Sequence, residues 1–183
     1  MSAETCIVAI DPGLTGAVAF YFPSAPDRVA VEDMPTAGGE IDTAALVRRI
    51  KQMGPTIAVI EQVHAMPKNG SIACFKLGMA YGAARAALTV SGVPTHLVTP
   101  NSWKKHMRLP GGDLGKEAGR AMAIRLFPAT SERFERKKDH NRADAALIAA
   151  FAADKLISST TAARSGCAGD GEAAASASPE LGA

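Results

Sequence analysis

Four acidic residues stand where a metal-dependent reaction could be carried out. Asp11 and Glu61 each end a short apolar run, and Asp139 and Asp144 flank the start of the last helical segment. Carboxylates gathered at one place repel one another, so divalent cations are needed to neutralise them. Mg²⁺ is the expected ion, with Mn²⁺ as a substitute, because it binds few carboxylates and keeps water and phosphate oxygens as other ligands. Two ions about 3.5–4 Å apart would promote phosphodiester hydrolysis.

Two of these acids also have ordinary structural interpretations, which the sequence leaves open. Asp11 is followed by Pro12 and Gly13, and an Asp side chain often caps such a turn. Asp144 stands in the first turn of a helical segment, where a negative charge interacts with the helix dipole by about 0.3–1 kcal/mol. A metal site therefore requires a fold that brings the acids together.

The stretch from residue 6 to residue 20 must position Asp11. Residues 7–10 form an apolar, β-favouring block, and the Pro-Gly turn after Asp11 leads into a second apolar run. This pattern predicts a buried strand that feeds a hairpin. Residues 29–34 (VAVEDM) alternate enough to predict a third strand, which completes a meander.

Glu61 ends a segment with the same pattern. Residues 56–61 (TIAVIE) form an apolar block that ends in one carboxylate, and residues 41–53 before it have helical spacing of apolar side chains. A helix between two strands makes a crossover, which places the two strands parallel. Asp11 and Glu61 are therefore expected at the same edge of the sheet, where open α/β sheets carry their sites.

The remaining segments predict an α/β fold, with a five-stranded mixed sheet flanked by helices. Residues 35–40 and 111–115 are expected to be loops. Helix 71–91 is rich in Ala and Gly, so it can pack closely on the sheet or on a second copy of the chain. The other predicted elements are a strand at 95–98, a short basic helix at 103–107, and helices at 116–127 and 142–156.

Composition favours a single water-soluble domain. The chain has 183 residues, 47% of them hydrophobic, but its apolar runs are shorter than the ~18–20 residues of a membrane span. Charged Glu4 comes too early for a secretory signal, so a cytoplasmic location without membrane association is expected. Cys6, Cys74 and Cys167 are far apart and form no CxxC pair, which argues against a disulfide framework or a zinc cluster.

Two stretches differ from the rest in composition. Between residues 104 and 142, eleven Lys and Arg accompany five Asp and Glu. Such a concentration is either a solvated face or a surface for a polyanion such as nucleic acid. Residues 158–183 are dominated by Ser, Thr, Ala and Gly. They are expected to form a disordered tail after a domain at 1–157, because they lack apolar side chains to bury.

Four segments together resemble the RuvC family of Holliday junction resolvases, in its phage-type branch. They are IVAIDPGLTGA from Ile7, IEQVHAMPKNGSIACFK from Ile60, TPNSWKK from Thr99 and DHNRADAALIA from Asp139, in family order. The resemblance runs over about residues 5–156. It implies an RNase H-like fold, a homodimer without a nucleotide cofactor, and Mg²⁺-dependent paired nicking of four-way DNA junctions.

The resemblance also assigns site residues. Asp11, Glu61 and Asp144 fall on three of the family's four acidic positions, but the fourth position is Asn141. Asp139 and His140, just upstream, are therefore the candidates to complete the catalytic site. Asp139 is favoured as the metal ligand because a hard cation prefers oxygen. His140, one helical turn before Asp144, could orient water or act as a general acid.

For DNA contact, the resemblance indicates two groups of residues. The first follows Glu61 and meets the junction core, where an exposed Phe75 could stack on bases or wedge between them. The second would hold phosphates of the scissile strand. The first group is Lys68, Ser71, Phe75 and Lys76, and the second is Lys104, Lys105 and Lys116. The alternative for Phe75 is an ordinary core position.

Three other functions remain open on the sequence. The run IDPGLTGAVA also resembles the first phosphate loop of sugar kinases and actin-like ATPases, but those proteins need a second domain. With Asn141 at an acidic position, the chain could instead bind branched DNA without cutting it. A nuclease of the same fold could also act on unbranched substrates, because substrate choice lies in shape and dimer geometry.

Overall fold

A five-stranded mixed sheet forms the centre of the protein, as the sequence predicts. The computed structural model describes residues 4–64 and 70–157, so Lys68 and the predicted tail lie outside the described residues. The strand order is β3-β2-β1-β6-β7, with β1, β2 and β3 antiparallel and β1, β6 and β7 parallel. The strands are β1 (Ile7–Asp11), β2 (Ala17–Tyr21), β3 (Ala30–Asp33), β6 (Ile57–Glu61) and β7 (Thr95–Val98).

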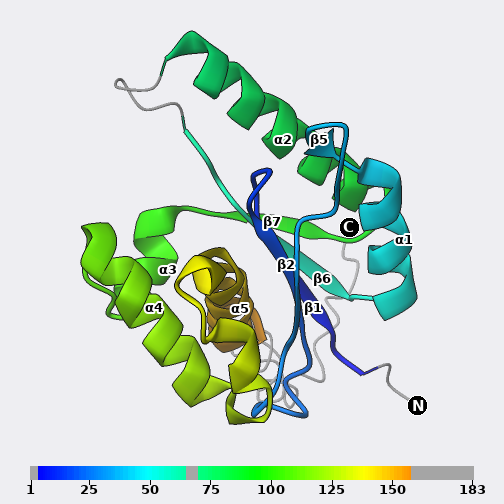
Figure 1. Ribbon diagram of the computed structural model, residues 1–183. Coiled ribbons are helices and arrows are strands. Elements are labelled where there is room, and N and C mark those ends of the chain that lie inside the picture. The colour runs from blue at the N-terminus through cyan, green and yellow to red at the C-terminus, as the bar shows by residue number, and fades with distance from the viewer. Residues whose placement is uncertain (1–3, 65–69, 158–183) are drawn as a thin grey trace, which may run out of the picture.

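Helices cover both faces of this sheet, so the molecule has three layers (Figure 1). Strand side chains alternate between the faces. Ile7 and Ala9 pack with helices α3, α4 and α5, whereas Val8 and Ile10 pack with α1 and α2. Because both faces of β1 are buried, its sequence is a continuous apolar run. The helices are α1 (Thr43–Met53), α2 (Ser71–Val90), α3 (Pro100–His106), α4 (Gly112–Leu126) and α5 (His140–Ala152).

Helix α1 is the predicted crossover between β1–β3 and β6. The side chain of Asp42 accepts a hydrogen bond from the Ala45 amide at 2.8 Å, which caps the helix start. Gly54 ends the helix in a left-handed conformation, and its amide donates to Ile50. Leu46 and Ile50 are fully buried against the sheet. The crossover therefore sets β6 parallel to β1.

Two predicted loops are wrong, because strand pairing occupies the first and helix α4 extends into the second. Within 35–40, β4 (Thr36–Ala37) and β5 (Glu40–Ile41) form a small hairpin, whose turn residues Gly38 and Gly39 both have positive φ. Within 111–115, α4 is already helical from Gly112. Helix α3 also begins at Pro100, earlier than predicted, because the Thr99 side chain caps it and accepts from the Ser102 amide.

The connection from α4 to α5 is short and irregular. Two 3₁₀ turns, η1 (Pro128–Phe134) and η2 (Lys137–Asp139), lead from α4 into α5, and a π turn, η3 (Ala153–Ile157), follows α5. Phe134 in η1 is fully buried beside Phe127, so this connection contributes to the core. None of the helices in the described part of the chain is long and apolar enough to cross a membrane.

Candidate active site

The turn after β1 fixes the end of the strand that carries Asp11. The Gly16 amide donates to the Gly13 carbonyl at 3.1 Å, and the Met34 amide donates to the Gly16 carbonyl at 2.9 Å. A Cβ atom at Gly16 would lie 2.1 Å from the Asp11 carbonyl oxygen, so no side chain fits there. The need for glycine at this position comes from close backbone approach.

Strand register then places Asp11 beside Glu61. Ile10 of β1 is the partner of Ile60 of β6, so the next residues on the two parallel strands are Asp11 and Glu61. Ala9 and Val59, two residues earlier, both belong to the core that contains α5. Side chains at i and i+2 share a face of a strand. Both carboxylates therefore lie on the side of the sheet that α5 covers. They also lie at the same edge of the sheet, as the sequence predicts.

Helix α5 brings the third carboxylate to the same place. It packs against β1 and β2 with a nearly all-alanine face, and Asp144 lies in its second turn. Oδ1 of Asp144 lies 3.5 Å from where a Cβ atom would stand on Gly119 of α4. Since Gly119 has no side chain, the carboxyl group of Asp144 fits between α4 and the sheet.

The three acids interact electrostatically. Desolvation, followed by the charges of Glu61 and Asp144, raises the pKa of Asp11 well above its usual value. Desolvation also raises the pKa of Asp144 to about 6, and Glu61 adds to the rise while Lys104, His140 and Lys116 oppose it. The structure thus brings Asp11, Glu61 and Asp144 together, with two lysines and a histidine near them.

The acids stand close but do not form a finished metal site. Among residues 4–64 and 70–157, no three His, Cys, Asp or Glu side chains are arranged to hold a metal ion. The donor chemistry nevertheless suits a hard divalent cation, because all three side chains offer carboxylate oxygens. Burial is the main cause of the raised pKa values of Asp11 and Asp144, and the neighbouring carboxylates add to it, so a cation bound here would favour the charged forms.

Trp103 joins this cluster, which sequence reasoning did not predict. Its indole Nε1–H donates to Oε1 of Glu61 at 2.7 Å, and its side chain is fully buried. The ammonium group of Lys104 lies over the same ring, 5.1 Å from its centroid. The available signal was the only tryptophan of the chain standing directly before a lysine that the resemblance assigned to the site.

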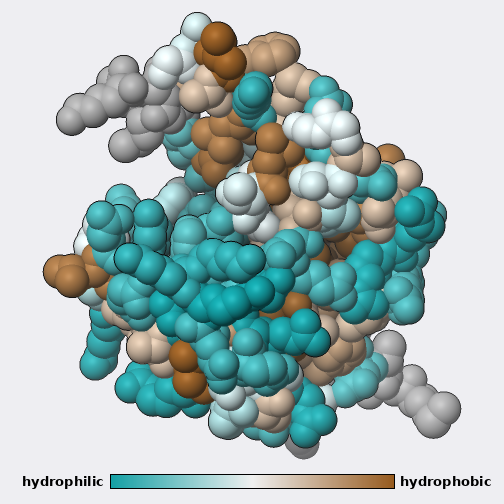
Figure 2. All heavy atoms as spheres, in the orientation of Figure 1, coloured by the Kyte–Doolittle hydropathy of each residue, from teal (hydrophilic) through white to brown (hydrophobic). Residues whose placement is uncertain are grey.

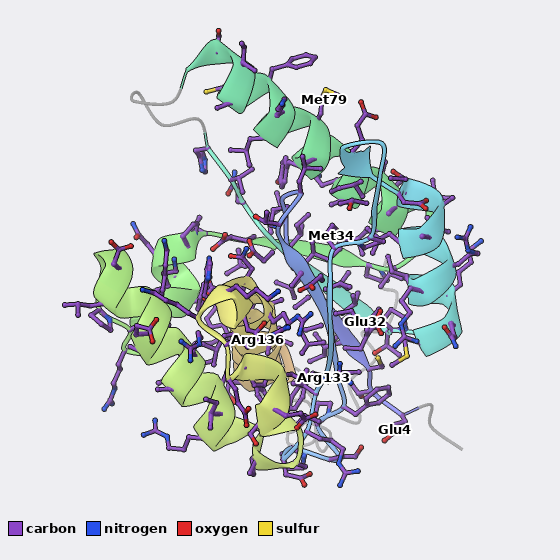
Figure 3. All side chains as sticks on the ribbon, in the orientation of Figure 1. Glu4, Glu32, Met34, Met79, Arg133 and Arg136 are labelled. Carbon is purple, nitrogen blue, oxygen red and sulfur yellow. The ribbon has the colours of Figure 1, made fainter. Side chains whose placement is uncertain are left out.

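Asp139 is placed differently from the other three acids. Its carboxylate accepts from the Arg136 backbone amide at 2.9 Å and from Arg136 Nη2 at 2.8 Å, and Arg142 Nη1 lies 3.8 Å away. Only 2% of Asp139 is exposed. Burial opposes ionisation, but these hydrogen bonds and charges hold its pKa below the usual value. Asp139 therefore anchors η2, the segment with Arg136 that leads into α5 (Figure 3).

The neighbours of Asp139 attach α5 to the sheet. The Asn141 side-chain amide donates to the Thr15 carbonyl at 2.6 Å, in the turn after Asp11. Arg142 forms a bidentate pair with Asp33 at the end of β3, at 2.6 and 2.5 Å. These contacts hold the start of α5 against the β1–β2 turn, and sequence spacing alone did not predict them.

His140 lies at the start of α5 with one ring nitrogen engaged. Its Nδ1 lies 3.3 Å from the Lys137 carbonyl, which can only accept, so Nδ1 carries the proton. Nε2 is therefore the nitrogen left for other contacts. The His140 charge acts on Asp144, which places the imidazole near the acid cluster.

The residues predicted to contact DNA lie on both sides of the acid cluster. On α2, Phe75 is 68% exposed, so the core alternative for this residue is wrong, and Ser71 and Lys76 are exposed beside it. Lys76 lines a small hollow of about 310 Å³ together with Asp11 and Asn141. Lys104 and Lys116 lie on the opposite side, on α3 and α4, with Lys105 exposed next to Lys104.

Figure 2 shows the surface hollowed between the α2 side and the α3–α4 side, with polar residues dominating the α4 side. The end of β1 points into the region between α2 and α3 in the ribbon view (Figure 1). A cluster of carboxylates with lysines on two sides suits a substrate that is anionic and reacts with metal assistance.

Comparisons with known proteins bear on this arrangement. No family model matches the chain. Over 93 residues, 51% of the chain, it is 36% identical to the chloroplastic Holliday junction resolvase MOC1 of Chlamydomonas reinhardtii. The matched stretch is 10% of the length of that relative.

Solved structures extend the comparison to most of the chain. RuvC of Thermus thermophilus in complex with a Holliday junction substrate has a TM-score of 0.59 at 21% identity, covering 90% of this chain and 98% of that one. A second Thermus thermophilus RuvC structure has a TM-score of 0.58 at 23% identity, covering 82% and 96%. The fold is that of RuvC. The expected RNase H-like architecture is confirmed.

The RuvC fold accounts for the meeting of residues that are far apart in sequence. Asp11 ends β1, Glu61 ends β6, and Asp144 belongs to α5, the helix that packs on the sheet. Trp103, Asn141 and Gly16 hold these elements in place through the contacts described above.

Proposed function

We propose that this chain is a Holliday junction resolvase, an endonuclease that nicks four-way DNA junctions with the help of divalent cations. The observation that carries the proposal is the meeting of Asp11, Glu61 and Asp144, with raised pKa values for both aspartates and with lysines near them. The RuvC fold and the 36% identical stretch shared with MOC1 support the same function.

Asp11, Glu61 and Asp144 are the residues that would hold the cations. Their carboxylate oxygens suit Mg²⁺, and Mn²⁺ would substitute for it. Bound cations supply an activated water and stabilise the leaving oxygen of a phosphodiester. The raised pKa values of the two aspartates support this role: burial is the main cause, neighbouring carboxylates add to it, and a bound cation would favour the charged forms that both effects disfavour.

The basic residues around the cluster would bind and orient the scissile strand. Lys104 and Lys116 act on the charge of Asp144 and so lie near the reacting phosphate. Lys105 and Lys76 extend the positive border on each side and would neutralise neighbouring phosphates. His140, with Nδ1 bound to Lys137, can present Nε2 to a water or leaving oxygen as a proton donor or acceptor.

We assign Asp139 a structural role in place of the ligand role that its position suggested. Its oxygens are engaged by Arg136 and by the nearby Arg142, and it is not among the charges that shift the pKa of Asp11 or Asp144. A carboxylate already paired with two guanidinium groups gains less from a cation than one held beside other carboxylates.

Helix α2 would serve the DNA at its start. Ser71, Phe75 and Lys76 lie on its first two turns, beside a groove of about 760 Å³ that α2 forms with the β4–β5 turn. An exposed aromatic ring next to a lysine can stack on a base while the ammonium binds a phosphate. Lys68, which precedes the helix, stays a prediction for the same surface.

The later part of α2 would serve a second copy of the chain. Met79, Gly82, Ala86 and Val90 follow one another at helical spacing and are all exposed, while the opposite side of α2 is buried on the sheet. An exposed line of apolar and small side chains on a helix suits close packing against a second helix. Two nicks placed symmetrically in a junction need two sites related by a twofold axis, which a homodimer provides.

The proposal is tested with a synthetic four-way junction. Wild-type protein is expected to cut it with Mg²⁺ or Mn²⁺ and to stop in EDTA. Asp11→Asn, Glu61→Gln and Asp144→Asn should each slow cutting roughly a thousandfold or more, because the cations supply several kcal/mol. The same variants should still bind the junction, since losing a negative charge reduces repulsion of phosphate.

The alternative functions are outcomes of the same experiment. Junction binding without cutting under any divalent cation would indicate a branched-DNA-binding protein. Equal cutting of a linear duplex and a junction would indicate a nuclease without junction selectivity. Neither the cytoplasmic location nor the place of this chain in the phage-type branch is addressed by these measurements, and both stay predictions.

A further inference from the structure

Trp103 stands where β6, β7 and α3 meet. Glu61, the last residue of β6, is the register partner of Val98 of β7, and the Gln62 amide donates to the Val98 carbonyl at 2.7 Å. Thr99 then caps α3, which places Trp103 in the first turns of that helix. The indole is therefore held next to the end of the strand that carries Glu61.

The single polar atom of the Trp103 side chain, Nε1, forms a hydrogen bond with Glu61. Nε1–H donates to Oε1 at 2.7 Å, while the rest of the ring is buried among residues of the α5-side core. A hydrogen bond to a charged acceptor is worth more than one between neutral groups. Because indole can only donate, the contact occupies one carboxylate oxygen, Oε1, and does not involve Oε2.

This contact solves a problem particular to Glu61. Its side chain has one more rotatable bond than Asp11 and Asp144, and the charges of those two acids repel it. A donor that fixes the Glu61 carboxylate therefore limits its movement away from the two aspartates. Lys104, which follows Trp103 and lies over its ring, acts on the charges of both aspartates. The Trp103-Lys104 pair therefore touches or faces all three acids.

We propose that Trp103 is a positioning residue, whose indole N–H holds the Glu61 carboxylate ready for a divalent cation. The inference rests on the proposed function in that it takes the three acids as a cation site. The competing interpretation is a core aromatic residue whose hydrogen bond is incidental. The two differ in what happens when the N–H is removed and the ring volume is kept.

Trp103→Phe removes the donor and keeps an aromatic ring in the core. Losing a partner that orients a metal ligand typically weakens metal affinity roughly 10–100-fold. We expect that loss for Mg²⁺ binding measured by calorimetry without DNA, and an equal shift in the Mg²⁺ concentration needed for half-maximal cutting. At saturating Mg²⁺, the maximal cutting rate should recover most of its wild-type value. Unchanged Mg²⁺ affinity in Trp103→Phe would overturn the inference.

Phe127→Leu is the matched control. Phe127 is buried in the same core, beside Phe134 and Tyr21, and its ring has no polar atom. It should lower the melting temperature and leave the Mg²⁺ affinity unchanged. If Phe127→Leu weakened Mg²⁺ binding as much as Trp103→Phe does, general loosening of the core would explain both, and the inference would fail.

The sole tryptophan allows a second test that does not depend on tolerance of Phe. Trp103 is the only tryptophan of the chain, so all tryptophan fluorescence of the wild-type protein comes from it. Titration with Mg²⁺ should change this fluorescence saturably, and Glu61→Gln should abolish the change. Uniform replacement of tryptophan by benzothienylalanine, in which sulfur replaces N–H, should weaken Mg²⁺ binding without altering ring size. Unchanged affinity in that protein would overturn the inference, even if cutting by the wild-type enzyme supports the proposed function.

Discussion

Asp139 and Asp144 lie five residues apart and have pKa shifts of opposite sign. Desolvation acts on both carboxyl groups. At Asp139 the two guanidinium partners outweigh it, whereas at Asp144 it prevails over Lys104 and Glu61 adds to the rise. The first carboxylate is thus stabilised in its charged form, and the second is destabilised until a cation arrives. The surroundings of the two carboxyl groups thus distinguish Asp139, a structural acid, from Asp144, a candidate metal ligand. Residue type alone cannot distinguish them.

The raised pKa of Asp144 predicts how the cation-free protein depends on pH. A carboxyl group with a folded pKa of about 6 and an unfolded pKa of about 3.9 keeps its proton longer when folded. Its destabilising effect is absent below about pH 4 and develops as pH rises towards about 6. In EDTA at pH 7, Asp144→Asn should therefore raise the free energy of unfolding by about 1–2 kcal/mol.

Urea denaturation at pH 4 and pH 7 measures this effect. The gain from Asp144→Asn should shrink towards zero at pH 4, where the wild-type carboxyl group is already protonated. Asp27→Asn, at a half-exposed position beside Arg28, should give no comparable gain at either pH. A loss of stability at pH 7 in Asp144→Asn would contradict the electrostatic account of this residue.

Asp139 and Asn141 are predicted to affect stability and cutting in different ways. Asp139→Asn leaves Arg136 and Arg142 without their buried partner, so it should cost about 1–3 kcal/mol of stability. At a temperature where the variant is folded, and at saturating Mg²⁺, its cutting rate should stay within about tenfold of wild type. Loss of cutting to the level of Asp144→Asn would instead support the ligand role first expected for Asp139.

Asn141→Ala removes the hydrogen bond from α5 to the turn after Asp11. It should raise the Mg²⁺ concentration needed for half-maximal cutting, because Asp144 is then held less firmly beside Asp11. Asn141→Asp is the informative companion, since it cannot donate to the Thr15 carbonyl but adds a negative charge. If Asn141→Asp cut better than wild type at low Mg²⁺, an acid at this position would be a direct ligand.

At the scale of elements, the β1–β2 turn is the feature least tolerant of change. A Cβ atom at Gly16 would lie 2.1 Å from a backbone oxygen of Asp11. Gly16→Ala must therefore shift the backbone beside a site residue, and we expect a loss of stability of several kcal/mol, at the exceptional end for single substitutions. Gly82→Ala is the control, because a Cβ atom there meets nothing within 4 Å, and alanine should stabilise α2 by about 1 kcal/mol.

Melting temperatures of the two variants test this contrast. They should move in opposite directions relative to the wild type. A stable, fully active Gly16→Ala protein would mean that the turn adopts another conformation than the one described.

The elements that the sequence predicted well are those with a strong local signal. The strands that carry Asp11 and Glu61 are continuous apolar runs, and α1 has an Asp cap and a terminal Gly. The meeting of the two acids at one edge of the sheet followed from the crossover, which makes the two strands parallel. The β4–β5 hairpin was missed because its strands have two residues each, too few for any periodicity.

The placement of Asp139 and Trp103 could not be predicted, for a related reason. The pairing of Asp139 with Arg136 depends on a 3₁₀ turn that has no sequence period, and its contact with Arg142 depends on how that turn joins α5. The bond from Trp103 to Glu61 joins residues 42 positions apart and exists only because β6 and β7 are paired. Such contacts depend on tertiary packing, which the local sequence pattern does not predict.

At the scale of the whole molecule, α2 is the element that the single chain does not fully use. Its buried side consists of Ala80, Ala84, Ala87 and Leu88, but its first turns stand clear of the sheet in the ribbon view (Figure 1). The part that carries Met79 lies at the edge of the molecule (Figure 3). Brown, hydrophobic atoms gather over α2 on the visible surface (Figure 2). An apolar surface of this kind favours contact with another macromolecule.

The last prediction separates the two uses proposed for α2. Ala86→Arg places a long charged side chain on the exposed line of Met79, Gly82 and Val90, so it should weaken self-association at least about tenfold if a second copy packs there. Ala121→Arg makes the same change at an exposed position of α4 and should leave self-association unchanged. Light scattering over a range of protein concentrations measures both.

Cutting then shows what self-association does for the reaction. A protein that pairs through the later part of α2 holds two acid clusters in fixed relation, so wild type should nick both strands of a junction within one binding event. Ala86→Arg should keep Mg²⁺-dependent nicking but lose the coupling, and nicked junctions should accumulate before products with two cuts. Phe75→Ala, in the first turns of α2, should instead weaken junction binding and leave self-association intact. A monomeric wild-type protein that still makes coupled cuts would rule out this use of α2, because one acid cluster cannot reach two symmetric positions at once.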